Sequence, residues 1–159
     1  MIKIDHILIE SISLQAKQSP RRRMNYNFHS GPEDTLQRML NAMEPGTYIQ
    51  PHKHEDPDKR EVFFALKGTL CIVEFEENGQ IRDYTILKAG GDCSGAEIPE
   101  RTFHTVISLE AGSVAYEIKD GPYVPIEDKN FAAWAPAENS PDAGPWLKQL
   151  LQKLNLLIM

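Results

Sequence analysis

Two histidines and a glutamate lie close together in the first half of the chain, and a third histidine follows about fifty residues later. These residues are His52, His54, Glu61 and His104. His52 and His54 are two positions apart, and side chains at i and i+2 of a β-strand point to the same face. Imidazole and carboxylate ligands together suit first-row divalent transition metals better than Mg²⁺ or Ca²⁺. The spacing therefore favours a β-rich fold that brings separate strands to one metal ion.

The region 35–120 reads as a ladder of short strands separated by turns. The expected strands cover residues 36–43, 47–50, 61–67, 70–75, 80–87, 104–109 and 113–119. Glu61 shares one face of its strand with Phe63, so Phe63 is expected to line the same interior as the metal. The Asn-Gly pair at 78–79 is a strong hairpin signal. Short strands at regular spacing are typical of an antiparallel sandwich or barrel.

A helix is expected on each side of the strand region. Residues 5–17 show the three-to-four spacing of one buried face, and Pro20 follows where that helix should end. Residues 145–158 begin with a proline, which is favoured near the first helical position, and carry a stripe of leucines. That stripe either packs on the chain's own barrel or covers a partner subunit.

The two histidine blocks resemble the two sequence motifs of the cupin family. The block 46–68 holds His-x-His and the glutamate between two glycines, and the block 91–104 ends on the third histidine. Two departures are visible: the gap before Glu61 is longer than usual, and Arg101 and Ser108 replace the usual glycine and asparagine. The resemblance implies a double-stranded β-helix, a jelly-roll barrel, with the four residues around a metal. Glu61 is expected either as the fourth ligand or as a hydrogen-bond partner of a ligand imidazole.

A narrower resemblance extends over roughly residues 4 to 138 and is to the WbuC-type cupin metalloproteins. It is carried by the segments 19–29, 37–38, 45–48, 97–99, 119–123 and 131–136. Members of that group are often associated with bacterial surface-polysaccharide gene clusters. The resemblance therefore implies a sugar or sugar-nucleotide derivative as the ligand.

Several further residues are candidates for a ligand pocket. Asn27 and His29 are expected near its mouth, and Arg38 is expected either to orient an acidic ligand or to lie on an exposed sheet face. The candidate walls are Tyr48, Gln50 and Phe63. The three arginines at 21–23 either complement the negative end of the first helix or form a cradle for an acidic ligand.

Length and composition predict a single domain over residues 1–159, which the resemblance implies is a cupin domain. Its expected parts are a helix and arm (1–30), the barrel (35–120), and a wrapping tail with the second helix (121–159). The net charge of −6 argues against nucleic acid or an anionic membrane as the main partner. The two cysteines form no disulfide framework, and no apolar run suits a signal peptide or a membrane span. The cytoplasm is the expected compartment.

The ligand pattern and the cupin resemblance together predict a metal-binding cupin protein that acts on a small polar metabolite, either anionic or a carbohydrate derivative. The cofactor is expected to be one divalent transition metal: Fe, Mn, Ni, Co or Zn. Isomerisation, epimerisation or oxygenation would suit such a site, and a non-enzymatic metal or ligand sensor is the alternative. No phosphate-binding loop or nucleophilic-serine motif is present in the sequence. A homodimer is expected, because pairing removes an open sheet edge.

Overall fold

The computed structural model describes residues 1–123 and 130–158, so residues 124–129 of the expected tail lie outside the described residues. Within those ranges it contains two helices and two five-stranded antiparallel sheets. The helices are α1 (His6–Gln18) and α2 (Ala143–Lys153). The strands are β1 (Arg23–Asn27), β2 (Leu36–Met43), β3 (His52–Lys53), β4 (Glu61–Lys67), β5 (Thr69–Phe75), β6 (Ile81–Lys88), β7 (Gly95–Ile98), β8 (Phe103–Ser108), β9 (Ser113–Asp120) and β10 (Asn130–Phe131).

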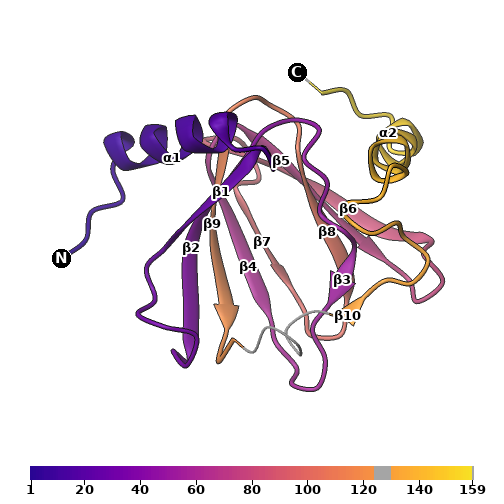
Figure 1. Ribbon diagram of the computed structural model, residues 1–159, viewed down its shortest axis with the longest axis horizontal. Helices are drawn as coiled ribbons and strands as arrows, with labels where there is room; N and C mark the ends of the chain where they lie inside the picture. The colour runs from indigo at the N-terminus through magenta and orange to yellow at the C-terminus, as the bar shows by residue number, and fades with distance from the viewer. Residues whose placement is uncertain (124–129, 159) are drawn as a thin grey trace.

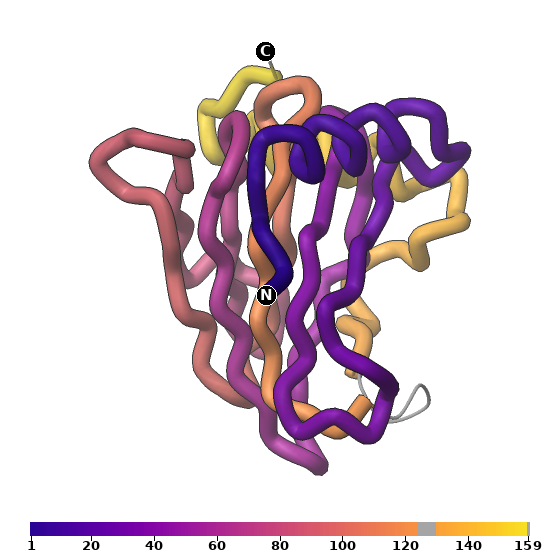
Figure 2. Tube along the Cα trace, turned by 90° about the vertical axis from the view of Figure 1, so that its left-hand side faces the viewer, coloured from indigo at the N-terminus to yellow at the C-terminus, as the bar shows by residue number. Residues whose placement is uncertain are grey.

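The two sheets face each other and enclose the interior of a barrel (Figure 1). The first sheet has the strand order β1-β2-β9-β4-β7 and the second β10-β3-β8-β5-β6. The chain crosses from one sheet to the other at most of its connections, whereas the pairs β1–β2 and β5–β6 each stay within one sheet. This is the jelly-roll arrangement that the sequence predicted. α1 lies across one end of the first sheet (Figure 2), and α2 lies outside the second (Figure 1). Neither helix has the length and apolar character that a membrane crossing requires, within the described ranges.

The inward-facing positions of the strands are apolar at one end of the barrel and polar at the other. Near α1 the inward positions are apolar: Met43, Ala65, Leu70, Leu87 and Ala115 belong to one buried cluster. Toward the other end of the same strands, Glu61 pairs in register with Lys119. The barrel core can therefore be stable through its apolar half while the other half carries polar chemistry.

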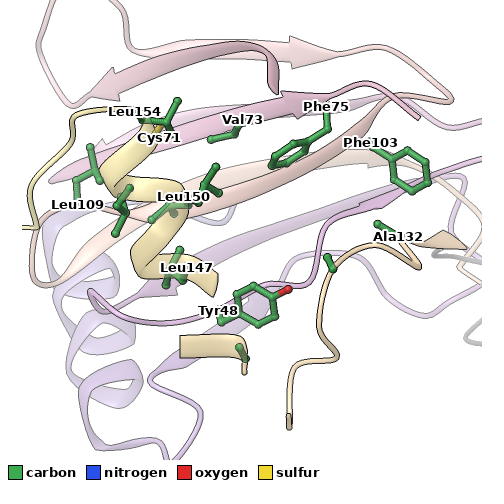
Figure 3. Close-up of a cluster of buried hydrophobic side chains, with 14 residues drawn as sticks. Tyr48, Cys71, Val73, Phe75, Phe103, Leu109, Ala132, Leu147, Leu150 and Leu154 are labelled. Carbon is green, nitrogen blue, oxygen red and sulfur yellow. The ribbon is translucent and has the colours of Figure 1, made fainter. Parts of the chain in front are cut away.

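The helix α2 packs on its own chain. Leu147, Leu150 and Leu154 are buried against the outer face of the second sheet, where they meet Cys71 and Phe75 among others (Figure 3). β5 is thus covered on both faces, by the barrel interior and by α2. Of the two alternatives for the leucine stripe, the structure selects packing on the chain's own barrel.

The second helix is shorter than the expected range 145–158. It begins at Ala143 and ends at Lys153. Asn155 adopts a left-handed φ of 54°, and the N–H groups of Asn155 and Leu156 donate to the carbonyls of Gln152 and Leu151. This hydrogen-bond pattern is a Schellman motif, which ends a helix by satisfying its last carbonyls.

The expected strand at 47–50 was wrong: the chain there forms no strand, and pairing starts only at His52. Three short strands were not expected, namely β1, β7 and β10. β1 has a polar sequence without alternation, so nothing local indicates a strand. It forms by pairing with the edge of β2, from Arg23 opposite Met43 to Asn27 opposite Met39.

Candidate metal centre

The four predicted ligand residues come together where the two sheets meet. His52 and His104 are direct partners in the β3–β8 ladder, and their ring centroids are 4.6 Å apart. His54 follows β3 by one residue, and Glu61 opens β4 in the opposite sheet. All four side chains are buried.

The distances suit a single ion. The four candidate ligand atoms all lie within 4.8 Å of one another. Nε2 of His54 is 3.1 Å from Oε1 of Glu61, and Nε2 of His104 is 2.8 Å from Oε2. Metal bonds of about 2.0–2.2 Å hold the ligands of one ion about 3–4 Å apart. The cluster could therefore hold a metal ion with little rearrangement.

Two of the histidine rings are oriented by the backbone. Nδ1 of His52 lies 3.0 Å from the carbonyl oxygen of Gln50, and Nδ1 of His104 lies 2.9 Å from that of Thr102. A carbonyl can only accept, so each Nδ1 carries the hydrogen and Nε2 is directed to the cluster. Fixing the ring through its other nitrogen is the usual support of a metal-ligating histidine. The residues therefore fit a metal through their donor chemistry as well as through their spacing.

Glu61 is held as an anion. Burial alone would raise the pKa of its carboxyl, but the close contacts with His104 and His54 outweigh burial and hold the pKa well below its usual range. Nζ of Lys119 lies 3.8 Å from the same carboxylate. A carboxylate kept ionised among nitrogen donors is the form that a metal ion requires.

The cluster lies in a cavity of about 880 Å³, which His52, Glu61 and His104 help to line. Apolar side chains, including Phe63, form part of its wall, and polar side chains form much of the rest. The polar lining residues that were not predicted for the pocket include Gln37, Asn41, Glu117 and Lys119. The available signal was the pair of charged residues Glu117 and Lys119, which are two positions apart on either side of Ile118 in the strand.

The pocket candidates fall into two groups. Asn27, His29 and Phe63 line the cavity, whereas Arg38, Tyr48 and Gln50 do not. His29 is fixed by Nδ1, which accepts from the backbone N–H of Arg38 at 3.1 Å.

Each of the three residues outside the cavity has a partner elsewhere. The Tyr48 hydroxyl donates to the carbonyl of Pro136, and Gln50 Nε2 donates to that of Ala132. Arg38 lies on the outer face of β2 and reaches the carbonyl of Phe28. The expectation that Tyr48 and Gln50 would form pocket walls was wrong, because 47–50 is not a strand. Of the two alternatives for Arg38, the structure favours the sheet face, because Arg38 alternates with the inward-facing Gln37 and Met39.

Two of the three arginines at 21–23 line the cavity. Arg23 pairs with Glu138, with 2.6 Å between Nη2 and Oε2, and also donates to the carbonyl of Tyr48. Arg21 lies 3.9 Å from the same Glu138 carboxylate. Glu138 therefore offsets part of the positive charge at this side of the cavity.

One protein-family model matches the sequence over residues 4–87, just over half of the chain. Its description is "Domain of unknown function (DUF6016)". The chain belongs to this family. No protein with a curated function matches the sequence of this DUF6016 member.

Solved structures resemble this DUF6016 protein in fold. KdgF from Halomonas sp. is 16% identical with a TM-score of 0.50, and the match covers 64% of this chain and 82% of that one. L-ribose isomerase from Cellulomonas parahominis is 16% identical with a TM-score of 0.54, over 74% and 71% of the two chains. The capsular polysaccharide assembling protein CapF from Staphylococcus aureus is 20% identical with a TM-score of 0.53, over 62% of this chain and 27% of that one.

The chain thus spans about a quarter of CapF. At these identities the likeness establishes the fold, which is the cupin jelly roll. It establishes neither membership of the WbuC-type group nor a shared activity.

Proposed function

We propose that this protein binds one divalent transition metal through His52, His54, His104 and Glu61, and acts there on a small polar metabolite. The observation that carries the proposal is the convergence of four buried donor groups beside a large, partly polar cavity. Structural metal sites are closed by their ligands, whereas a site that opens on a cavity leaves room for a ligand molecule. A divalent ion bound there would polarise a carbonyl or hydroxyl group of that molecule.

The chain's own residues have separate tasks in this proposal. The backbone carbonyls of Gln50 and Thr102 orient two imidazoles, and Lys119 adds a positive charge next to Glu61. Phe63, buried on the inward face of β4, limits the access of water to the cluster. Such preorganisation is what a metal-dependent isomerase or oxygenase needs.

We further propose that the metabolite is a sugar derivative of surface-polysaccharide metabolism. The support is the resemblance to WbuC-type cupins and the polar lining of the cavity. Among proteins of similar fold, one acts on L-ribose according to its name and another is a capsular polysaccharide assembling protein. These names describe those proteins and make the same substrate class worth testing here.

Metal analysis followed by a ligand screen tests the proposal. Purified full-length protein should contain close to one equivalent of a transition metal after reconstitution, measured by elemental analysis. Thermal shift with a panel of monosaccharides should then show stabilisation by mass action only in the metal-loaded protein. Protein that takes up no metal would sink the proposal. Metal-dependent binding without any turnover would favour the ligand sensor over the enzyme.

We also propose a homodimer. β6 and β7 are edge strands of the two sheets, and open edges favour pairing with another chain. Because α2 is already buried on its own barrel, it is not expected to supply the contact. Light scattering at micromolar concentration should give twice the 18.0 kDa chain mass, and a monomer would refute the dimer.

A further inference from the structure

One buried polar pair inside the barrel has no role in the metal cluster. Asn41 on β2 donates from Nδ2 to Oε2 of Glu117 on β9, at 2.8 Å. Both side chains are 8% exposed, and both line the cavity. A buried amide–carboxylate pair in a barrel needs an explanation, because apolar side chains of similar size would fill the space without desolvating polar groups.

The orientation of the Asn41 amide satisfies the Glu117 carboxylate. A carboxylate only accepts, so the amide nitrogen of Asn41 must face it. This leaves the amide oxygen Oδ1 buried, and it has no hydrogen-bond partner among the described residues. An unsatisfied buried acceptor lowers stability. Asn41 therefore holds the Glu117 carboxylate in place inside the cavity, while its own amide oxygen is left without a hydrogen bond in the described part of the chain.

Lys119 adds a donor next to this acceptor. Glu117 and Lys119 are two positions apart on β9, so their side chains point to the same, inward face. Lys119 is 5% exposed and lines the cavity, with Nζ 3.8 Å from the Glu61 carboxylate. The inner face of β9 thus presents a fixed acceptor and a fixed donor side by side, directly next to the candidate metal cluster.

A hydroxyl group is the ligand chemistry that matches this wall. A hydroxyl can accept from the ammonium of Lys119 while it donates to the carboxylate of Glu117. A ligand carboxylate or phosphate can only accept, and it would face the negative charge of Glu117 without a hydrogen to share. The positive charge of Lys119 is partly offset for such an anion, because the Glu61 carboxylate lies 3.8 Å from its Nζ and Glu117 is on the same inward face of β9.

We propose that Glu117 and Lys119 bind hydroxyl groups of a neutral polyhydroxylated ligand, and that Asn41 is the positioning residue that holds Glu117 for this task. This inference rests on the proposed function, because it takes the ligand to lie beside the metal. It narrows the proposed ligand from sugar derivatives in general, charged ones included, to uncharged sugars or polyols.

The test compares neutral sugars with their matched acids on metal-loaded, full-length protein. Neutral pentoses and hexoses, and the corresponding aldonic and uronic acids, are titrated by calorimetry. The wild type should bind at least one neutral sugar about tenfold or more tightly than its matched acid. Binding of the acid as tightly as the sugar overturns the inference while leaving the proposed function intact. If the metal-loaded protein binds none of the sugars or acids, the inference is also overturned. If the protein takes up no metal, it is the proposed function that fails.

A double variant separates ligand binding from folding. Asn41→Leu with Glu117→Met replaces the polar pair by apolar side chains, which also removes the unsatisfied acceptor. We expect a melting temperature no lower than that of the wild type, unchanged metal content, and loss of sugar binding by about tenfold or more. Unchanged sugar affinity in this variant overturns the inference.

Two single variants test positioning and specificity. Glu117→Gln frees the Asn41 amide to turn, so the preference for the neutral sugar over its acid should shrink with the metal content unchanged. Glu97→Gln, an exposed carboxylate on β7, is the matched control and should leave that preference as it is. A preference that is equally unchanged in Glu117→Gln would contradict the role assigned to the carboxylate.

Discussion

Arg101 donates a hydrogen bond from Nε to the carboxylate of Asp58, with 2.9 Å between Nε and Oδ2. Its backbone N–H also donates to the carbonyl of His54 at 3.0 Å. Asp58 lies in the long gap between His54 and Glu61, and Arg101 replaces the usual glycine of the second cupin-like motif. The two departures from the cupin pattern are therefore in contact, and the arginine holds the longer loop against the metal cluster.

Arg101→Gly should loosen this loop without unfolding the protein. Arg101 adopts a left-handed φ of 61°, which glycine accepts without strain, and the lost ion pair is exposed to solvent. We expect a small change in melting temperature, together with faster amide hydrogen exchange in residues 55–60. Arg82→Ala, which removes another exposed ion pair, is the control. Exchange rates in 55–60 that match the wild type would mean that the arginine does not hold the loop.

His52→Ala and His104→Ala should each lower metal affinity by at least about tenfold and leave a folded barrel. The apolar cluster near α1 contains neither histidine, so the core remains. Metal content by elemental analysis and secondary structure by circular dichroism measure the two effects. His6→Ala removes a histidine from α1, far from the cluster in sequence, and should keep full metal content. A variant that fails to fold even with saturating metal would indicate a structural site.

Leu150→Ala should destabilise the protein by about 2–5 kcal/mol in urea unfolding, because the side chain is 4% exposed in the cluster between α2 and the second sheet. Leu157→Ala is the control, since Leu157 is 84% exposed and should change stability by less than about 0.5 kcal/mol. Equal effects of the two substitutions would contradict packing of α2 on its own barrel.

The contact between Glu10 and Lys67 should make the docking of α1 depend on pH. Nζ of Lys67 lies 2.7 Å from Oε2 of Glu10, and this hydrogen bond lowers the pKa of the Glu10 carboxyl below its ordinary value. The folded state thus favours the ionised form, so its stabilising effect is present above the ordinary pKa and is lost as the pH falls through the lowered one.

Glu10→Gln should accordingly reduce the free energy of unfolding near neutral pH, with the difference from the wild type disappearing in acid. Denaturant unfolding at several pH values measures this difference, and Glu33→Gln is the control for an exposed carboxylate elsewhere. A difference that persists at the lowest pH would contradict an origin in the charged form of Glu10.

Local patterns were sufficient for much of the fold and for the metal cluster. The strands 36–43 and 61–67 have the bounds that were predicted, because alternation and turn residues are properties of neighbouring positions. The convergence of His52, His54, Glu61 and His104 followed from their spacing and from the cupin resemblance.

The rest depended on contacts between distant segments. The leucine stripe of α2 is compatible with either burial on its own barrel or contact with a second subunit. It is buried on its own barrel because the outer face of β5 and β8 is apolar. Tyr48 was predicted in the pocket but packs near α2, with its ring 5.7 Å from that of Trp146. Glu117 and Lys119 could be assigned to a strand from the sequence alone. That they face the cavity is set by the register of β9 between β2 and β4, because a shift of one residue would turn both outward.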